Sequence, residues 1–342
     1  MVAGYGRTVT QTEVDVLVIG AGVIGLTTAT CLAEAGVSVA IATAEPPRQT
    51  TSVAAGAIWG PHLVGMDETV ARWGEVTLAR FAEFSAPDIG ANALDGIVRI
   101  ATGIAALREA GAAVPEFAAR TALAPCEPDE IPPGYRSAWR LSAPIIAMPG
   151  YLDYLAERYA RAGGSAPFPA EVGTLDDARV LAPSARVIVN CTGCGARDLV
   201  PDPEVMPVRG QVVVASNPGI TEFFVGAGPD PADLTYLIPH GDVIVLGGTQ
   251  QPGDWSREPD PATAERIIAA CTAVRPGLAG AIVLEHRVGL RPTRPRVRLA
   301  TEPGDGVTIV HNYGHGGAGV TLSWGCAEDA VALTLEALGA LG

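Results

Sequence analysis

Apolar runs of strand length and segments with helical periodicity follow one another from the start of the chain. Residues 14–19 are mostly apolar and have the length of a buried strand, and residues 37–43, VSVAIAT, form a second such run. The segment between them consists of helix-forming residues and ends at Gly36, a residue favoured at helix C-termini. The pattern predicts a strand, a helix and a second strand, the beginning of a parallel sheet.

Helical periodicity predicts three further helices, at residues 68–86, 151–164 and 262–274. A buried strand is expected within residues 185–193, ARVIVNCTG. The proline- and acid-rich segment 126–135 is typical of a surface loop. The first sheet therefore resumes after a long excursion.

The excursion ends in strand-like runs at residues 209–216, 233–239 and 242–249, separated by Pro, Gly and Asp, which indicates antiparallel pairing. We predict an α/β fold, in which a Rossmann-like nucleotide-binding domain is interleaved with an α+β domain built on a mixed, largely antiparallel sheet. The first domain is expected to comprise residues 12–58, 146–204 and 300–342, and the second residues 59–145 and 205–299.

A glycine motif, GAGVIG at residues 20–25, lies where the first strand should turn into the helix. In that context its first glycine allows the tight turn and its second lets a pyrophosphate approach the backbone. Its third glycine packs the helix against the sheet. The free N–H groups at the start of the helix would then bind phosphate oxygens. The motif predicts a dinucleotide cofactor.

The end of the second strand lacks the acidic residue that usually holds the adenosine ribose. Thr43 and Ala44 occupy this position, and Glu45 follows two residues late. The ribose would be held either by Glu45 or by the backbone and threonine. Small and hydroxylated residues crowd the following segment, 48–63, which favours a flavin over NAD without excluding NAD.

Composition excludes two classes of protein. Hydrophobic residues make up 48% of the 342 residues and charged residues 18%, which indicates a folded chain and not a disordered one. The formal net charge of −14 argues against nucleic acid, because contacts to phosphates need clustered basic residues. No apolar stretch is long enough to span a bilayer, and no cleavable leader is recognisable, so we expect a cytoplasmic protein with a loose segment at residues 1–12.

Cysteine spacing gives little support for a metal site, and we expect none. Of the six cysteines, only Cys191 and Cys194 form a C-x-x-C pair, and no second pair completes a zinc site. We interpret both as small buried thiols in a reducing compartment, with metal binding as the alternative.

The densest basic cluster is HRVGLRPTRPRVRL at residues 286–299. It is either a solvated arginine-rich loop or an extended segment held by its prolines. In the second case Arg291, which precedes Pro292, would present a fixed guanidinium, as two parallel bonds to a carboxylate require. Tyr236, a phenol among apolar residues, is either a second polar contact or an ordinary strand-surface tyrosine.

The most unusual stretch is VTIVHNYGHGGAGVTLSWGCAEDAVALTLEAL at residues 307–338. An apolar run meets His311 and Tyr313, then several glycines, then a segment of helix formers. The glycines are explained either by a tight turn or by a backbone pressed against something flat and large.

Five blocks of the chain together resemble the D-amino-acid oxidase family, which includes the D-aspartate oxidases. They are TTSVAAG at 50–56, VIVNCTG at 187–193, the run from YLIP to GDWS at 236–256, VGLRPTRP at 288–295 and HNYGHGGAGVTLSWGCAEDA at 311–330. The resemblance extends from about residue 16 to residue 338. It implies an FAD-binding domain interleaved with a substrate domain.

The chemistry that the resemblance implies is oxidative deamination of D-amino acids. Arg291 would bind the substrate carboxylate, Tyr236 would donate its hydroxyl to it, and the carbonyl of Gly317 would receive the amine. The Cα hydride passes to flavin N5, the imino acid hydrolyses to a 2-oxo acid and ammonia, and dioxygen becomes hydrogen peroxide. The helix start after the glycine turn would stabilise charge on the flavin. No acid–base residue is needed, including His311 and His315.

The resemblance also implies a set of residues that contact FAD. These are Gly20, Ala21, Gly22, Val23, Ile24, Gly25, Thr43, Ala44, Thr50, Thr51, Ser52, Ala55, Gly56, Val172, Thr192, Gly316, Gly317, Ala318, Gly319, Val320 and Thr321.

Several positions bear on the choice of substrate. Gln250 stands where aspartate-directed members carry an arginine, which favours neutral side chains, whereas His62 resembles the acidic-substrate branch. A tyrosine that covers the pocket in mammalian members corresponds here to about Ala232. A D-aspartate or D-glutamate oxidase is therefore the main alternative, and a glycine or amine oxidase or a non-catalytic flavin-binding protein are lesser ones.

The expected partners are a D-amino acid and dioxygen, without nucleic acid or membrane, and a homodimer is left open. The C-terminal LGALG is not a peroxisomal address, as expected of a bacterial cytoplasmic enzyme.

Overall fold

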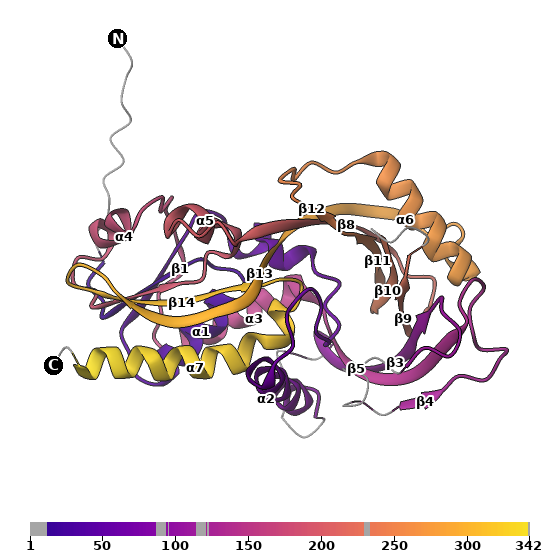
Figure 1. The fold of residues 1–342 in the computed structure, drawn as a ribbon, viewed down its shortest axis with the longest axis horizontal. Coiled ribbons are helices and arrows are strands. Elements are labelled where there is room, and N and C mark those ends of the chain that lie inside the picture. The colour runs from indigo at the N-terminus through magenta and orange to yellow at the C-terminus, as the bar shows by residue number, and fades with distance from the viewer. Residues whose placement is uncertain are drawn as a thin grey trace, which may run out of the picture.

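The computed structural model describes residues 12–86, 94, 96–113, 121, 123–228 and 233–340. The loose segment expected at the start of the chain lies outside these residues except for Thr12, and so does Ala232. The described strands form one sheet of 14 strands that extends along the molecule (Figure 1). We call its parallel, helix-covered end the nucleotide half and its other end the antiparallel half.

The nucleotide half is built on parallel strands, as the apolar runs predicted. Its strands are β1 (Val16–Ile19), β2 (Val39–Thr43), β6 (Phe168–Pro169), β7 (Val187–Asn190) and β14 (Thr308–His315). Its helices are α1 (Val23–Glu34), α3 (Met148–Arg161), α4 (Leu175–Leu181), α5 (Ala196–Leu199) and α7 (Gly319–Ala340). Val16 and Val18 pack in one core with α1, α3 and α7, whereas Leu17 and Ile19 pack on the opposite face with α4, because alternate residues of a strand face opposite layers.

The antiparallel half confirms the strands and the helix predicted for the later part of the chain. Its strands are β3 (Val98–Leu107), β4 (Leu123–Pro125), β5 (Ser137–Ile146), β8 (Met206–Ser216), β9 (Phe223–Ala227), β10 (Asp233–His240), β11 (Val243–Thr249) and β12 (Gln251–Pro252). Within it β3 and β9 run parallel, and the other pairs are antiparallel. Helix α6 (Pro261–Val274) covers one face by packing Ile267 and Cys271 against Val213 and Leu246.

One long strand, β13 (Val283–Pro303), joins the two halves into a single sheet. Its first part pairs with β8, from Val283 to Thr293, and its last part pairs with β14 from Arg298 onward. The arginine-rich segment 286–299 is therefore an extended strand and not a solvated loop. The predicted domain boundary between residues 299 and 300 falls inside β13.

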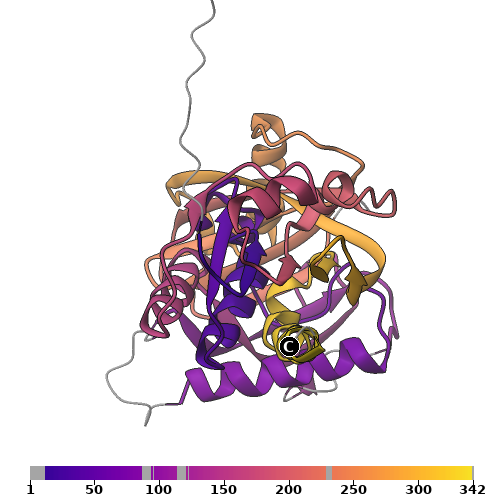
Figure 2. The same cartoon turned by 90° about the vertical axis from the view of Figure 1, so that its left-hand side faces the viewer.

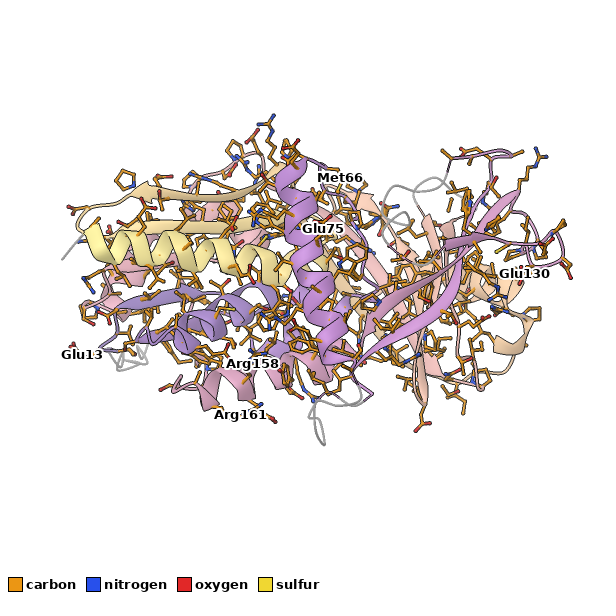
Figure 3. The ribbon with its side chains drawn as sticks, turned by 90° about the horizontal axis from the view of Figure 1, so that it is seen from below. Glu13, Met66, Glu75, Glu130, Arg158 and Arg161 are labelled. Carbon is orange, nitrogen blue, oxygen red and sulfur yellow. The ribbon has the colours of Figure 1, made fainter. Side chains whose placement is uncertain are left out.

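Helix α2 (Glu68–Phe84) crosses the junction on the outside of α7 (Figure 3). The side chain of Asp67 caps its start by accepting a hydrogen bond of 2.9 Å from the amide of Val70. Its Val70 and Trp73 pack in one apolar cluster with Leu322 of α7. In the end-on view of α7, α2 runs across it (Figure 2). The helix thus contacts the nucleotide half, although the predicted division assigns it to the second domain.

Among the described helices, none combines the length and apolar character that a bilayer span requires.

Candidate functional site

A cavity of about 770 Å³ receives side chains from both halves of the sheet, and most of the predicted site residues line it. They are Gly20, Ala21, Gly22, Val23, Ile24, Thr43, Ala44, Thr50, Thr51, Ser52, Ala55, Gly56, His62, Val172, Thr192, Tyr236, Arg291, Gly316, Gly317, Gly319, Val320 and Thr321. Gly25, Ala318 and Gln250 are not part of the lining. The sequence blocks that were far apart along the chain therefore meet around one space.

The glycine motif forms a tight turn between β1 and α1. Gly20 has φ of +108°, and a Cβ there would lie 2.5 Å from the carbonyl oxygen of Cys191. A Cβ on Gly25 would overlap the carbonyl oxygen of Gly20, so Gly25 allows the helix to pack on the turn and does not face the cavity. Gly22 faces the cavity, and the hydroxyl of Ser52 accepts a 2.9 Å hydrogen bond from the amide of Val23. The start of α1 thus opens onto the cavity, as phosphate binding requires.

The end of β2 is organised by a turn that Thr43 stabilises. The hydroxyl of Thr43 donates a 2.7 Å hydrogen bond to the carbonyl of Glu45. The carboxylate of Glu45 forms an ion pair with Arg257, which also donates a 2.9 Å hydrogen bond to the carbonyl of Gln49. Sequence reasoning missed Arg257 as a lining residue, because it lies 212 positions from Glu45 and no local motif marks it.

The C-terminal glycines accommodate the loop that contains His62 and Leu63. Gly316 has φ of +56°, and a Cβ there would overlap the carbonyl oxygen of Leu63. The amide of Gly317 donates a 3.0 Å hydrogen bond to the carbonyl of His62, and a Cβ on Gly317 would lie 2.5 Å from the imidazole ring. The tight turn considered for these glycines is therefore present, and the close approach of another backbone adds to the need for them; contact with something large and flat stays a prediction.

The side chain of Thr321 connects the start of α7 to the loop at residues 58–62. The hydroxyl of Thr321 accepts a 3.1 Å hydrogen bond from the amide of Gly60 and donates a 2.9 Å hydrogen bond to the carbonyl of Gly60. Ala318 is fully buried beneath the turn and packs with Val70 and Trp73, which explains why it does not reach the cavity. The first turn of α7 contributes Gly319, Val320 and Thr321 to the lining.

Arg291 and Tyr236 meet at the antiparallel end of the cavity. A guanidinium nitrogen of Arg291 donates a 2.9 Å hydrogen bond to the carbonyl of Thr249, and the group lies so close to Gly210 that any side chain there would overlap it. Tyr236 interacts with the guanidinium and is 9% exposed. Burial lowers the pKa of Arg291 from its ordinary value and raises the pKa of Tyr236. Within the described residues, no carboxylate forms an ion pair with Arg291.

The imidazoles at the cavity are held in the neutral form. Burial, reinforced by the charge of Arg291, lowers the pKa of His62 to about 4. Burial lowers the pKa of His315 to about 3, and its Nε2 lies 3.1 Å from the side-chain oxygen of Asn312. The Nε2 of His62 is buried without a hydrogen-bond partner. His311, whose Nε2 lies 3.1 Å from a carboxylate oxygen of Glu302, does not line the cavity.

The cysteine pair lies beside the glycine turn. Cys191 and Cys194 both line the cavity, and burial raises the pKa of each thiol to about 12. Across the described residues, no group of three or more His, Cys, Asp and Glu side chains is arranged to hold a metal ion.

The lining fits a dinucleotide that carries a large flat ring. The glycine turn and the start of α1 offer backbone donors at one end. Small residues leave room along the middle, where Gly56 faces Tyr236. At the other end His62 and Arg291 line the space beside the turn before α7. The residues that would hold FAD and those that would hold a small anion are thus next to one another.

Comparison with known proteins identifies the family. The family model described as "FAD dependent oxidoreductase" matches residues 15–333. A D-amino-acid oxidase of Rubrobacter xylanophilus is 46% identical over 326 residues, which cover 94% of this chain and 96% of the relative. A D-amino-acid oxidase of Streptomyces coelicolor is 43% identical (94% and 99% covered), and a D-aspartate oxidase of Homo sapiens is 33% identical (95% and 96% covered).

Solved structures share the fold at low sequence identity. Glycine oxidase from Geobacillus kaustophilus superposes with a TM-score of 0.76 at 18% identity, covering 95% of both chains. L-α-glycerophosphate oxidase from Mycoplasma pneumoniae, solved with FAD bound, superposes with a TM-score of 0.73 at 15% identity, again covering 95% of both. The cavity geometry, the family model and the full-length relatives agree: this chain belongs to the D-amino-acid oxidase family of FAD-dependent oxidoreductases.

Proposed function

We propose that this protein is a D-amino-acid oxidase that converts D-amino acids with neutral side chains to 2-oxo acids, ammonia and hydrogen peroxide. The observation that carries the proposal is the guanidinium of Arg291, which lines the cavity without a carboxylate partner among the described residues. A buried cation without a counter-charge is costly, and an incoming carboxylate would neutralise it. The full-length relatives named D-amino-acid oxidase support the same activity.

FAD, when bound, supplies the hydride acceptor and the group from which dioxygen takes electrons to become hydrogen peroxide. The glycine turn at residues 20–25 and the start of α1 would hold its diphosphate. The turn at residues 316–321 and the segment 50–56 would enclose its ring system, with Thr192 and Val172 beside the connecting part.

The protein's own residues orient the substrate. Arg291 binds the carboxylate through paired charge-assisted hydrogen bonds, and the hydroxyl of Tyr236 donates a further bond to it. The carbonyl of Gly317 accepts a hydrogen bond from the amine. With carboxylate and amine fixed, only one hand of amino acid directs its Cα–H at the ring and its side chain into free space, so positioning and not acid–base catalysis selects the D form.

The preference for neutral side chains rests on the charges around the cavity. Among the described lining residues, the formal charges are Glu45, Arg257 and Arg291. Arg257 is already paired with Glu45, and Arg291 is assigned to the α-carboxylate. His62 is neutral above pH 4 or so, because its pKa is lowered to about 4. A second carboxylate would therefore meet no free cation.

Acidic D-amino acids are the second candidate substrates, and one observation favours them. His62 lines the cavity and its Nε2 has no hydrogen-bond partner, so a turn of the imidazole ring that exposes this nitrogen would offer one neutral hydrogen bond to a side-chain carboxylate. The human relative named D-aspartate oxidase, at 33% identity, is in line with this alternative.

An anaerobic absorption spectrum of the purified protein, before and after addition of amino acid, tests the proposal. We expect flavin bands that bleach with D-alanine and D-methionine and remain with the L forms. Bleaching with D-aspartate alone would favour the second candidate. A protein without flavin bands that takes up no added FAD would contradict both.

Three further expectations stay part of this proposal. They are the division into an FAD-binding and a substrate domain, assembly as a homodimer and a cytoplasmic location. Sedimentation velocity of the purified protein would test the assembly as a homodimer.

A further inference from the structure

A second guanidinium reaches the cavity at the end opposite Arg291. Arg257 lies in the connection between β12 and α6, in the antiparallel half, yet it lines the cavity together with Thr43, Ala44 and Glu45 at the end of β2. In a Rossmann-like fold, the end of the second strand is where the adenosine ribose of a dinucleotide binds. Arg257 therefore stands at the dinucleotide end.

The side chain of Arg257 has two partners, both in the nucleotide half. It forms an ion pair with the carboxylate of Glu45 and donates a 2.9 Å hydrogen bond to the carbonyl of Gln49. We call the ion pair the Glu45–Arg257 bridge. It connects the two halves of the molecule at the edge of the cavity.

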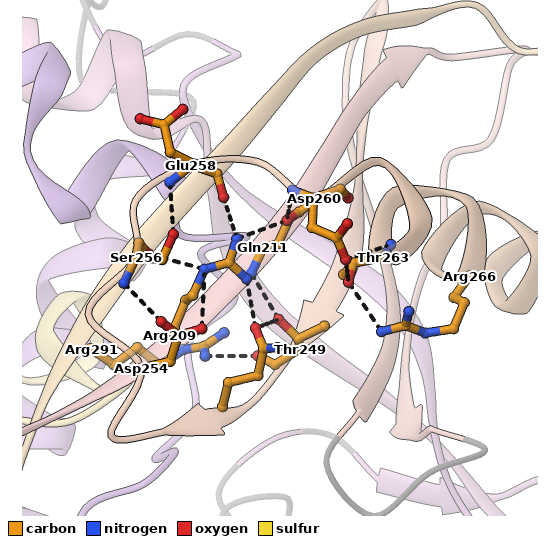
Figure 4. Close-up of polar contacts among 11 residues, drawn as sticks. Arg209, Gln211, Thr249, Asp254, Ser256, Glu258, Asp260, Thr263, Arg266 and Arg291 are labelled. Carbon is orange, nitrogen blue, oxygen red and sulfur yellow. Dashed lines mark hydrogen bonds and ion pairs between the residues drawn. The ribbon is translucent and has the colours of Figure 1, made fainter.

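The backbone on either side of Arg257 is held in place by a buried arginine. Arg209, which is 2% exposed, donates a 3.0 Å hydrogen bond to the carbonyl of Ser256 and one of 2.6 Å to the carbonyl of Glu258 (Figure 4). The carboxylate of Asp254 accepts a 2.8 Å hydrogen bond from the amide of Ser256. Arg257 is thus presented to the nucleotide half by a rigid segment and does not depend on a mobile loop to find Glu45.

The bridge contributes little to folding but is well placed to hold a ligand. The side chains of Arg257 and Glu45 are 46% and 35% exposed, and ion pairs of this exposure stabilise a fold only slightly. Glu45 and Arg257 both line the cavity at the end of β2, however, so a dinucleotide bound along β2 would lie next to this contact and would have to part it to leave at this end. Its diphosphate also carries negative charge into a chain of net charge −14, so a cation at this end favours binding.

We propose that the Glu45–Arg257 bridge is a cofactor-retention device, which closes the dinucleotide end of the cavity over bound FAD and slows its release. The inference rests on the FAD placement given under the proposed function. It also accounts for the missing acidic residue at the end of β2. At this end the cofactor is retained by a contact between the two halves, in place of the acidic residue that usually stands at position 43 or 44.

The test compares Arg257→Ala, Glu45→Gln and the double variant as holoenzymes. Each is diluted, and the rise in fluorescence of released FAD gives the dissociation rate, while titration gives the Kd. We expect each single change to raise the dissociation rate by up to about fivefold, the effect of losing an exposed ion pair worth up to about 1 kcal/mol, and to raise the Kd less, because FAD must also part the bridge to enter. The double variant should match the single ones, because all three remove the same interaction. High salt should reduce the difference in FAD dissociation rate between the variants and the native protein, since the ion pair is exposed and salt screens it.

Arg72→Ala is the matched control. Arg72 forms an ion pair of similar exposure with Asp329 (48% and 32%) and does not line the cavity, so its loss should leave FAD release unchanged. Two results would overturn the inference: variants that release FAD like the control, or a slow release in Glu45→Gln with fast release in Arg257→Ala, which would mean that the cation acts without the bridge. Bleaching of FAD-saturated variants by D-alanine is measured separately, so the inference can fail while the proposed oxidase activity stands.

Discussion

Two buried guanidiniums on neighbouring strands serve opposite purposes. Arg209 on β8 is in register with Leu290 on β13, next to Arg291. The guanidinium of Arg209 donates to two backbone carbonyls and to the side-chain oxygens of Gln211 and Gln251. That of Arg291 donates to one carbonyl, of Thr249 (Figure 4), interacts with Tyr236 and lines the cavity. The same side chain is a structural anchor where its donors are satisfied, and the proposed function makes it a ligand-binding group where donors are left open.

The difference follows from the cost of burying charge. A guanidinium has five N–H donors, and burial is tolerated when oxygen acceptors surround them. The segment 249–260 supplies three of the four acceptors of Arg209, and Gln211 the fourth, whereas Gly210 only makes room for the guanidinium of Arg291, which lines the cavity. We expect substitutions at the two positions to separate stability from activity.

The largest effect should come from Arg209→Met. Removing the cation leaves two carbonyl and two amide oxygens, buried or partly buried, without this donor, which should lower the free energy of unfolding by about 3–5 kcal/mol. Chemical denaturation measures this. The exposed Arg296 offers a control, since Arg296→Met should change stability little. If Arg209→Met kept its full stability but lost activity, the structural role assigned to Arg209 would be wrong.

Arg291→Ala should have the next largest effect, and on activity instead of stability. Loss of a charge-assisted contact to the substrate carboxylate costs roughly 2–5 kcal/mol, so kcat/KM for D-alanine should fall about 30-fold to several thousand-fold. The flavin spectrum and the melting temperature should stay close to those of the native protein. Steady-state kinetics that match those of Arg296→Ala would remove Arg291 from the proposed site.

The pKa of His62 also distinguishes Arg291 from Arg209. Its pKa is lowered to about 4 by burial and by the charge of Arg291. In Arg291→Ala the pKa of His62 should rise, because a neighbouring cation no longer opposes protonation, and in Arg209→Met it should not move. An NMR titration of the imidazole, assigned with a His62→Asn variant, measures it. A pKa that stays unchanged in Arg291→Ala would mean that burial alone sets it.

The same shift predicts how stability depends on pH. The folded pKa of His62 lies below its ordinary value of 6.5, so the unfolded chain takes up the proton more readily. This contribution to stability is complete above about pH 6.5 and is lost as the pH falls towards 4. His315, with its pKa lowered to about 3, acts in the same direction. Melting temperatures that rise over this acid range would contradict the burial of both imidazoles.

Tyr236→Phe should have a smaller effect than Arg291→Ala. The hydroxyl contributes one hydrogen bond to a carboxylate that Arg291 already neutralises, so the loss should be about 1 kcal/mol, or roughly fivefold in kcat/KM. Steady-state kinetics with D-alanine measure it. Unchanged kinetics would mean that the hydroxyl does not reach the substrate.

Gln250→Arg should have the smallest effect. The resemblance places Gln250 where aspartate-directed members carry an arginine, but Gln250 does not line the cavity. We expect kcat/KM for D-aspartate to change by no more than about twofold, as for a substitution outside the site. A large gain would show that an arginine at this position reaches the side chain of the substrate.

Much of the fold could be predicted because it is encoded locally. The apolar runs at residues 14–19 and 37–43 and the GAGVIG motif between them predicted the first strand, turn and helix of the sheet. The arginine-rich segment 286–299 could not be decided in this way. It is a strand because β8 and β14 flank it, and both belong to distant parts of the chain.

The candidate site likewise combines features encoded locally with features that only the tertiary structure sets. Residue types and their order along the chain predicted a dinucleotide cofactor and singled out Arg291, and the resemblance of five sequence blocks to the D-amino-acid oxidase family indicated an FAD-dependent oxidase. Only the tertiary structure decided which arginines keep open donors and which do not, and it alone brought Arg257 to Glu45. Periodicity and turn chemistry depend on neighbours in sequence, whereas the partners of a charged side chain are brought together by the fold, 42 positions apart for Arg209 and Gln251 and 212 apart for Arg257 and Glu45.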